Sequence, residues 1–379
     1  MIIPILPSFP LRDILQFSTT GIFNGEYWKS DPHERVYLFS RGKWALQAMA
    51  ESCLEKEISR KRMLFVPEYF CDSSLEPLRS SGFQLHFYKI RENMEPDIDH
   101  LYYLVKKIGP PSILVFVHYF GIPLNLEPVN LFCKDRDIVL IEDGAHSLGP
   151  VPGIGDHNNP IIYTPWKFIP SLEGALLVLP KGMEKIAWNV TERRRTEGYP
   201  WNWIAKRVLY DFLVWIRFPI HKIKNYAPRE YSSVTNSDES TEPLCRSFFQ
   251  NLLQTSSRRF GFIAKRRENN FLTLDKMIRE ASMEGFSLIR KNPSSFSPYL
   301  YPLRLPGKIS WKLMTVLVRE GIPALPWSEL SPEVTHSTEY QGARLMQKEI
   351  VTLPVHHSLT EKNMVWMGER LIKRIRELL

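Results

Sequence analysis

Two charged residues, 24 positions apart, carry most of the chemistry that this sequence suggests. Asp143 ends the apolar run Val-Leu-Ile-Glu-Asp, and Lys167 stands six residues before the pair Glu173-Gly174. A lysine amine can form a Schiff base with an aldehyde cofactor and then move a proton. The ring of such a cofactor is an effective electron sink when a carboxylate keeps its nitrogen protonated. The acid followed by the lysine therefore predicts a pyridoxal phosphate (PLP) site.

The phosphate of this cofactor needs backbone N–H groups at the start of a helix, with small or cationic side chains nearby. Residues 40–43, Ser-Arg-Gly-Lys, lead into a helical stretch and meet that need. A lone lysine or a lone acid at a strand end would mean little, because both are common. The ordered combination favours one cofactor site.

Composition places the chain among globular proteins with two domains. Its 379 residues exceed one ordinary core, and 44% are hydrophobic and 24% charged. The four cysteines have no CxxC spacing, so they predict neither a metal site nor a disulfide framework, and they fit a reducing cytoplasm. The N-terminus lacks the basic start and long apolar core of a signal peptide.

The net charge is +8. This charge either favours an anionic partner or reflects only a basic surface. The partners considered are a phosphate-bearing substrate, nucleic acid and a membrane surface. No nucleic-acid motif appears and the positive charge is dispersed, so we expect no nucleic-acid partner.

Apolar runs alternate with helical stretches over the first part of the chain. We expect helices at 36–54, 73–81, 99–107 and 127–135, and strands at 63–67, 83–88, 112–118 and 138–143. Uninterrupted apolar strands separated by helices indicate a parallel sheet covered on both faces. Ligands bind beyond the carboxyl ends of such strands, where His118 and Asp143 fall.

From about residue 247 the pattern becomes that of a smaller α+β domain. We expect a helix over 256–284, a strand at 300–305, a helix at 309–319, a second strand after Gly321 and a closing helix at 360–377. The predicted domains are therefore 1–246 and 247–379. Residues 228–243 are polar and aperiodic, which predicts a mobile loop.

Residues 201–225 are aromatic and basic. Lys206, Arg207, Asp211 and Arg217 interrupt this stretch, so it is not expected to span a membrane. We favour a buried or dimer-packing helix, and the alternative is an interfacial helix that makes a peripheral membrane contact.

In order and over nearly its whole length, the chain resembles the PLP-dependent sugar aminotransferases named for DegT, DnrJ, EryC1 and StrS. The resembling segments are residues 40–46 (the phosphate turn), 66–71 (Pro-x-Tyr-Thr), 117–121 (His-x-Tyr-Gly), 141–146 (Glu-Asp-Ala-Ala-Gln/His), Lys167 with Glu173-Gly174, 319–323, and 353–360 (Leu-Pro-x-His-x-x-Leu-Thr). The last motif is quite specific. The resemblance implies an α/β fold of type I among PLP-dependent transferases, with a mainly parallel seven-stranded sheet between helices and a smaller C-terminal α+β domain.

The resemblance also implies roles for individual residues. Lys167 would be the Schiff-base lysine, Asp143 would pair with the pyridine nitrogen, and His146 would contact the ring or its O3′. The other cofactor-binding positions are Gly42 and Lys43 at the phosphate, Tyr69 and Cys71 at the pocket wall, and Thr164 as a hydroxyl.

Several of these positions have a purely structural alternative. His146 could be a core histidine at a strand end, and Tyr69 and Cys71 could serve packing alone. We interpret His118 as a cap of its strand rather than a site residue. His356 and His357 are interpreted as structural residues before the last helix.

The chain departs from the family pattern mainly around the lysine. Lys43 replaces the threonine of the phosphate turn, and Ile162 stands where a serine is usual. Leu172 and Ala175 occupy two glycine positions, and the Asn-x-Arg segment has only a partial counterpart in residues 198–202. These departures affect positions that would bind the cofactor and select the substrate.

The resemblance implies an enzyme that transfers an amino group, usually from glutamate, to a keto group of a nucleotide-linked sugar for surface polysaccharide or glycoconjugate synthesis. Such an enzyme would be a cytoplasmic homodimer with its site at the subunit interface. The alternatives are a PLP-dependent sugar dehydratase, against which Lys167 argues, and a non-catalytic member with a regulatory or assembly role.

Overall fold

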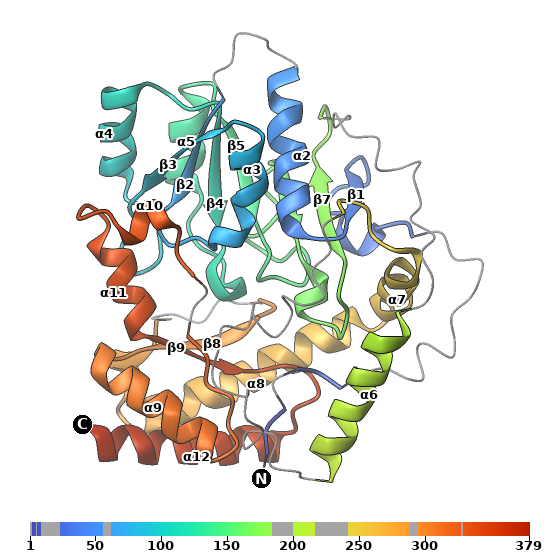
Figure 1. Ribbon diagram of the computed structural model, residues 1–379, viewed down its shortest axis with the longest axis vertical. Helices are drawn as coiled ribbons and strands as arrows, with labels where there is room; N and C mark the ends of the chain where they lie inside the picture. Colours follow the sequence, from blue (N-terminus) through green and yellow to red (C-terminus); the bar gives the residue numbers. More distant parts are fainter. Residues whose placement is uncertain are drawn as a thin grey trace.

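The computed structural model describes residues 2–4, 6–8, 23–55, 62–183, 200–216, 242–288, 295–326 and 329–379. Figure 1 shows a central sheet with helices α2 to α5 in the upper part of the molecule. A two-stranded sheet with helices α8, α9 and α12 lies below it.

The central sheet has seven strands in the order β1-β7-β6-β5-β4-β2-β3. Their bounds are β1 (Arg35–Phe39), β2 (Met63–Pro67), β3 (Gln84–Tyr88), β4 (Ile113–Val117), β5 (Val139–Asp143), β6 (Ile161–Tyr163) and β7 (Ala175–Leu179). Only β7 runs against its two neighbours, and the other pairings are parallel. The mainly parallel seven-stranded sheet predicted from the sequence is confirmed.

The strands form here because both faces of the sheet are covered. Every residue of β2, β4 and β7 is buried, which explains their unbroken apolar sequences. The covering helices are α2 (Gly42–Glu55), α3 (Glu76–Ser80), α4 (Ile98–Ile108) and α5 (Glu127–Lys134). Capping fixes their ends: the Asp97 carboxylate accepts from the N–H of Asp99 and of His100 at the start of α4.

The register of the sheet determines where the candidate site residues lie. Val117 pairs with Asp143 across β4 and β5, and Asp143 pairs with Ile162 across β5 and β6. The carboxyl ends of these three strands therefore meet at one edge. Asp143 and the segment that follows Tyr163 are brought together there, as expected for a ligand site in this architecture.

Two of the predicted helices were wrong in their bounds. The helix expected over 36–54 begins only at Gly42, because Arg35–Phe39 pairs with β7 as strand β1. Its Val-Tyr-Leu-Phe sequence is rich in residues that favour strands.

The helix expected over 256–284 is two helices, α7 (Ser247–Ser257) and α8 (Phe260–Glu280). They serve different cores: α7 buries Phe248 and Phe249 beside Trp203, whereas α8 starts with Phe260 packed on Trp28. The chain therefore turns between them.

The C-terminal part contains β8 (Leu300–Arg304), α9 (Gly307–Arg319), α10 (Pro332–Thr335), α11 (Gln341–Glu349), β9 (Ile350–Pro354) and α12 (Glu361–Leu378). The strand expected after Gly321 is only an isolated bridge between Leu325 and Thr352. Pro323 and Pro326 flank that bridge, and proline cannot donate to a ladder. The boundary at residue 246 stays a prediction.

Two further expectations fall partly outside the described residues. Of the stretch 201–225, Trp201–Trp215 forms helix α6, and residues 217–225 are not described. Of the predicted loop 228–243, residues 228–241 are not described. Among the helices in the described ranges, none is long and apolar enough to cross a bilayer.

Candidate active site

A cavity of about 190 Å³ opens at the carboxyl edge of the central sheet. All eight site residues predicted from the sequence line it, namely Gly42, Lys43, Tyr69, Cys71, Asp143, His146, Thr164 and Lys167. Arg41 of the predicted phosphate turn and Trp166 also line it, as does Tyr299, which the sequence did not single out. His118, His356 and His357 do not line it, in agreement with their structural interpretation.

Lys167 lies in the short helix η4 (Pro165–Lys167), directly after β6. Its backbone N–H donates to the Thr164 carbonyl at 3.0 Å, which fixes the turn. Its Nζ lies 5.7 Å from the centre of the Tyr299 ring. Burial lowers the pKa of Lys167, while the Asp143 carboxylate acts in the opposite direction. A lowered pKa leaves more of the amine neutral, which is the form that attacks a carbonyl.

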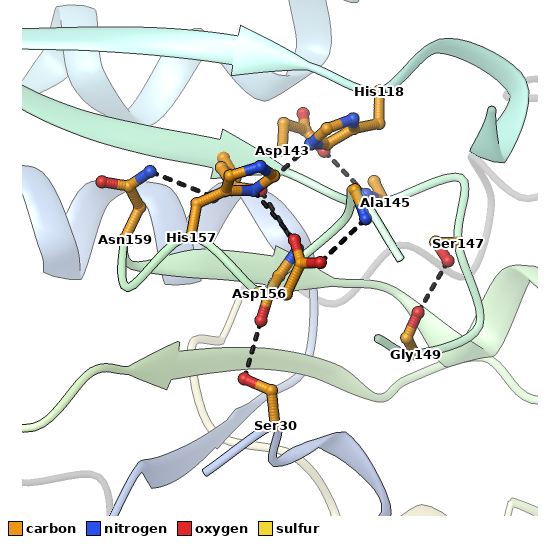
Figure 2. Close-up of polar contacts among 12 residues, drawn as sticks. Ser30, His118, Asp143, Ala145, Ser147, Gly149, Asp156, His157 and Asn159 are labelled. Atoms are coloured by element: carbon orange, nitrogen blue, oxygen red, sulfur yellow. Dashed lines mark hydrogen bonds and ion pairs between the residues drawn. The ribbon is translucent and has the colours of Figure 1, made fainter. Parts of the chain in front are cut away.

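Asp143 is the last residue of β5, and its Oδ1 accepts a hydrogen bond of 2.8 Å from the N–H of Ala145 (Figure 2). Burial raises the pKa of Asp143, and the charge of Lys167 and this hydrogen bond oppose the rise. Burial thus disfavours the charged form of both residues. A cation beside Asp143 and an anion near Lys167 would stabilise the pair.

A second carboxylate, Glu142, lies behind Asp143 and is fully buried. Its Oε2 accepts from His118 Nε2 at 3.0 Å and from the N–H of Gly155 at 3.1 Å, and its Oε1 accepts from Asn159 Nδ2 at 3.1 Å. Figure 2 shows His118 and Asn159 on two sides of this network, close to Asp143. His118 therefore pairs with a carboxylate and does not cap the backbone.

Sequence reasoning missed the part played by Glu142. The signal for it was the Glu-Asp pair itself: in a strand, neighbouring side chains point to opposite faces, so one acid can face the cavity while the other faces the core.

His146 presents a flat, uncharged ring to the cavity. The ring stacks on Tyr299 with 5.0 Å between centroids and on Phe120 with 6.1 Å. Its Nδ1 accepts from the N–H of Phe120 at 3.1 Å, so the neutral ring carries its proton on Nε2. Burial and the nearby Lys167 charge hold the pKa of His146 well below its usual range.

The backbone next to His146 is strained to make this contact. Phe120 has φ of 60°, a conformation that non-glycine residues adopt rarely. Gly121 follows with φ of 78°, and a Cβ there would lie 2.0 Å from the carbonyl oxygen of His146. Only glycine fits at position 121, and this close approach keeps His146 in place.

The start of α2 forms the cationic end of the cavity. A Cβ at Gly42 would lie 3.1 Å from Thr164 Cγ2, so the helix approaches η4 closely. The Arg41 guanidinium stacks on Trp166 at 4.3 Å, and Lys43 Nζ lies 3.9 Å from Glu76. Backbone N–H groups at a helix start attract anions, and these cations add to that field.

The remaining predicted residues complete the wall. Thr164 donates its hydroxyl proton to the Ala145 carbonyl at 2.7 Å, so it ties η4 to the end of β5. Tyr69 is fully buried and tilts against Tyr119 at 5.8 Å, and Cys71 Sγ lies 3.2 Å from Ser73 Oγ.

No protein-family model and no curated protein sequence matches the chain. Solved structures do match it over its whole length. A protein of Streptococcus pneumoniae described as a sugar aminotransferase, Spr1654 in its PMP form, has a TM-score of 0.70 and 16% identity, and the match covers 100% of this chain and 98% of that one. Helicobacter pylori PseC, an aminotransferase involved in pseudoaminic acid biosynthesis, has a TM-score of 0.63 and 16% identity over 99% and 98% of the two chains.

A DegT DnrJ EryC1 StrS aminotransferase from Brucella abortus has a TM-score of 0.62 and 15% identity over 98% of this chain and 91% of that one. These matches establish the fold: the chain has the fold of the type I PLP-dependent aminotransferases. The fold expected from the resemblance is confirmed.

Proposed function

We propose that this protein is a PLP-dependent aminotransferase that transfers an amino group from an amino acid to a keto group of a sugar. One observation carries the proposal. Lys167 and Asp143 line one cavity at the carboxyl edge of the sheet, and burial disfavours the charged form of each. This is the setting in which a lysine becomes a nucleophile and a proton carrier.

The residues present fit the cofactor. A protonated ring nitrogen would supply the cation that the buried Asp143 carboxylate needs, and a phosphate at the start of α2 would meet Arg41 and Lys43. His146 and Tyr299 both line the cavity, so the cofactor ring would lie beside aromatic side chains. When bound, pyridoxal phosphate supplies an electron sink that lets a proton leave the carbon carrying the amino group.

The chain's own residues would then act as follows. Asp143 would hold the proton on the ring nitrogen, and Glu142 behind it accepts hydrogen bonds from His118, Gly155 and Asn159. Lys167 Nζ would take up the proton that leaves the donor's Cα and hold it within the cavity for return to the reacting groups. His146 and Tyr299 cover the site and keep water away from these transfers.

We further propose glutamate as the donor and a nucleotide-linked sugar as the acceptor, in surface polysaccharide or glycoconjugate synthesis. Both substrates are anionic, and Arg41 and Lys43 face the cavity while Asp143 is the only carboxylate among its described lining residues. The protein would work as a homodimer. We place it in the cytoplasm, because its four cysteines are free thiols.

Spectroscopy of the purified protein tests the proposal. Added pyridoxal phosphate should give the absorbance of a lysine-bound cofactor, and stoichiometric glutamate should convert it to the pyridoxamine form in a single turnover. A protein that binds no cofactor, or whose bound cofactor does not change with any amino acid, would refute the assignment. Loss of water from a sugar without amino-acid consumption would indicate the dehydratase alternative.

A further inference from the structure

Helix α6 (Trp201–Trp215) lies at the side of the molecule (Figure 1). Its buried residues, Trp203 and Arg207, lie on one face of the helix. Trp203 is buried edge-on against Phe249 at 5.4 Å, and the buried Arg207 donates to the Pro7 carbonyl at 2.6 Å. These contacts attach the helix firmly to the rest of the protein. Its orientation, and so the direction of its other face, is fixed by the fold.

The opposite face of α6 is an exposed apolar surface, which we call the outer stripe. Its members and their exposed fractions are Trp201 (68%), Leu209 (55%), Phe212 (51%), Trp215 (77%) and Ile216 (45%). At about 100° of rotation per residue, all five fall within one third of the helix circumference. Exposed apolar side chains gathered on one face indicate a surface that is covered in use.

We propose that the outer stripe docks the protein on an anionic lipid surface. The helix has fifteen residues and is about 22 Å long, too short for the about 30 Å of a hydrocarbon core, so it would lie in the plane of the interface. The stripe begins and nearly ends with tryptophan, whose apolar ring and polar N–H suit the boundary between lipid tails and headgroups.

Charge favours lipid over a second copy of the chain. The chain has a net charge of +8, and on α6 the exposed Lys206 lies beside the stripe. A two-fold contact through the stripe would bring together two chains that carry the same net positive charge. Anionic headgroups complement that charge instead. This inference does not depend on the proposed reaction.

Vesicle flotation tests the proposal. We expect the protein to float with vesicles of equal parts phosphatidylcholine and phosphatidylglycerol at low salt, and less with phosphatidylcholine alone. Raising the ionic strength from about 0.01 M to about 1 M shortens the Debye length from about 30 Å to about 3 Å, and it should release much of the bound protein.

Two substitutions distinguish binding through the outer stripe from nonspecific adsorption of the protein to vesicles. The double variant Phe212→Gln/Trp215→Gln should lower the vesicle-bound fraction at least about tenfold, because both side chains are exposed and their loss leaves the fold intact. Lys206→Glu should weaken binding only to the anionic vesicles. The matched control is Trp311→Gln, a tryptophan 61% exposed on α9, which Figure 1 shows away from α6; it should bind normally.

Three outcomes would overturn the proposal. The first is no flotation at low salt, and the second is an equal loss of binding in the Trp311 control. The third comes from light scattering: if the double variant turns a dimer into a monomer and neither form binds vesicles, the stripe is an interface between copies of this chain.

Discussion

At the scale of single residues, burial is what gives the cavity its chemistry. Lys167 and Asp143 carry opposite charges, and the surrounding protein disfavours both charged forms. A bound cofactor with a cationic ring nitrogen would relieve the cost for Asp143. Two predictions follow from the residues that hold and support this pair.

Lys167→Ala should abolish the absorbance of the lysine-bound cofactor and lower amino transfer by about three orders of magnitude or more, because in the proposed mechanism the residue is both nucleophile and proton carrier. Lys43→Ala is the matched control, since Lys43 lines the same cavity from α2. It should keep the absorbance band and weaken cofactor affinity. A Lys167→Ala variant that retains the band would mean that another amine holds the cofactor.

Glu142→Gln should destabilise the protein by about 1 to 3 kcal/mol. Both oxygens of Glu142 accept hydrogen bonds, so the amide NH₂ of glutamine must face a donor whichever way it turns. Chemical denaturation measures the change. Glu339→Gln, at a partly exposed side chain beside His100, should change stability by less than about 0.5 kcal/mol. Equal effects of the two substitutions would show that the buried network does not stabilise the fold.

At the scale of elements, close approaches of backbone hold the cavity wall. Gly121 in η3 (Tyr119–Gly121) and Gly82 after α3 have nearly equal φ, 78° and 76°. A Cβ at Gly121 would meet the His146 carbonyl at 2.0 Å, whereas a Cβ at Gly82 meets nothing within 4 Å.

Gly82→Ala should therefore cost only the backbone strain, about 1 to 2 kcal/mol. Gly121→Ala should cost more, above about 3 kcal/mol, and should displace His146. Thermal or chemical denaturation compares the two variants, and cofactor affinity reports the movement of His146. Similar losses of stability in the two variants would mean that η3 moves to accommodate the added methyl group at no further energetic cost.

The elements also explain what the sequence could and could not reveal. Uninterrupted apolar strands such as β4, and the acid at the end of β5, are local signals, and their positions were predicted correctly. Strand β6 has only three residues, too few for a clear period, and only two residues separate β1 from α2, so the two elements read as one helix. The Arg41–Trp166 stack joins residues 125 positions apart, and such a contact depends on the sheet order rather than on local sequence.

At the scale of the whole molecule, Glu68 connects the central sheet with α11. It follows β2, is 2% exposed and accepts from the N–H of Ile90 at 3.1 Å, and its carboxylate faces the first turn of α11 at Gly342. Burial raises the pKa of Glu68 to about 7; the N–H groups of Ile90 and Ala343 and the charge of Lys89 oppose the rise, and Asp97 adds to it.

Because the folded state binds the Glu68 proton more tightly than the unfolded state, ionisation of Glu68 should lower stability as pH rises from about 4.5 to about 7. The effect is up to about 3 kcal/mol. Glu68→Gln should remove this component, so its stability relative to the wild type should increase with pH. Denaturation at about pH 5 and about pH 8 gives the comparison. If the stability difference between Glu68→Gln and the wild type were the same at both pH values, a group other than Glu68 would cause the pH dependence.

The direction of strand β7 has a consequence for how this protein can change over evolutionary time. Parallel neighbours require a crossover helix, but β6 and β7 are antiparallel, and residues 164–174 connect them directly at the cavity edge. Lys167 thus lies in a hairpin loop, which is closed by a hydrogen bond from the Trp166 N–H to the Gly174 carbonyl. Substitutions in such a loop can reshape the floor of the cavity without moving a helix. Of the unusual residues near Lys167, Leu172 lies in this loop, and Ile162 and Ala175 flank it in β6 and β7.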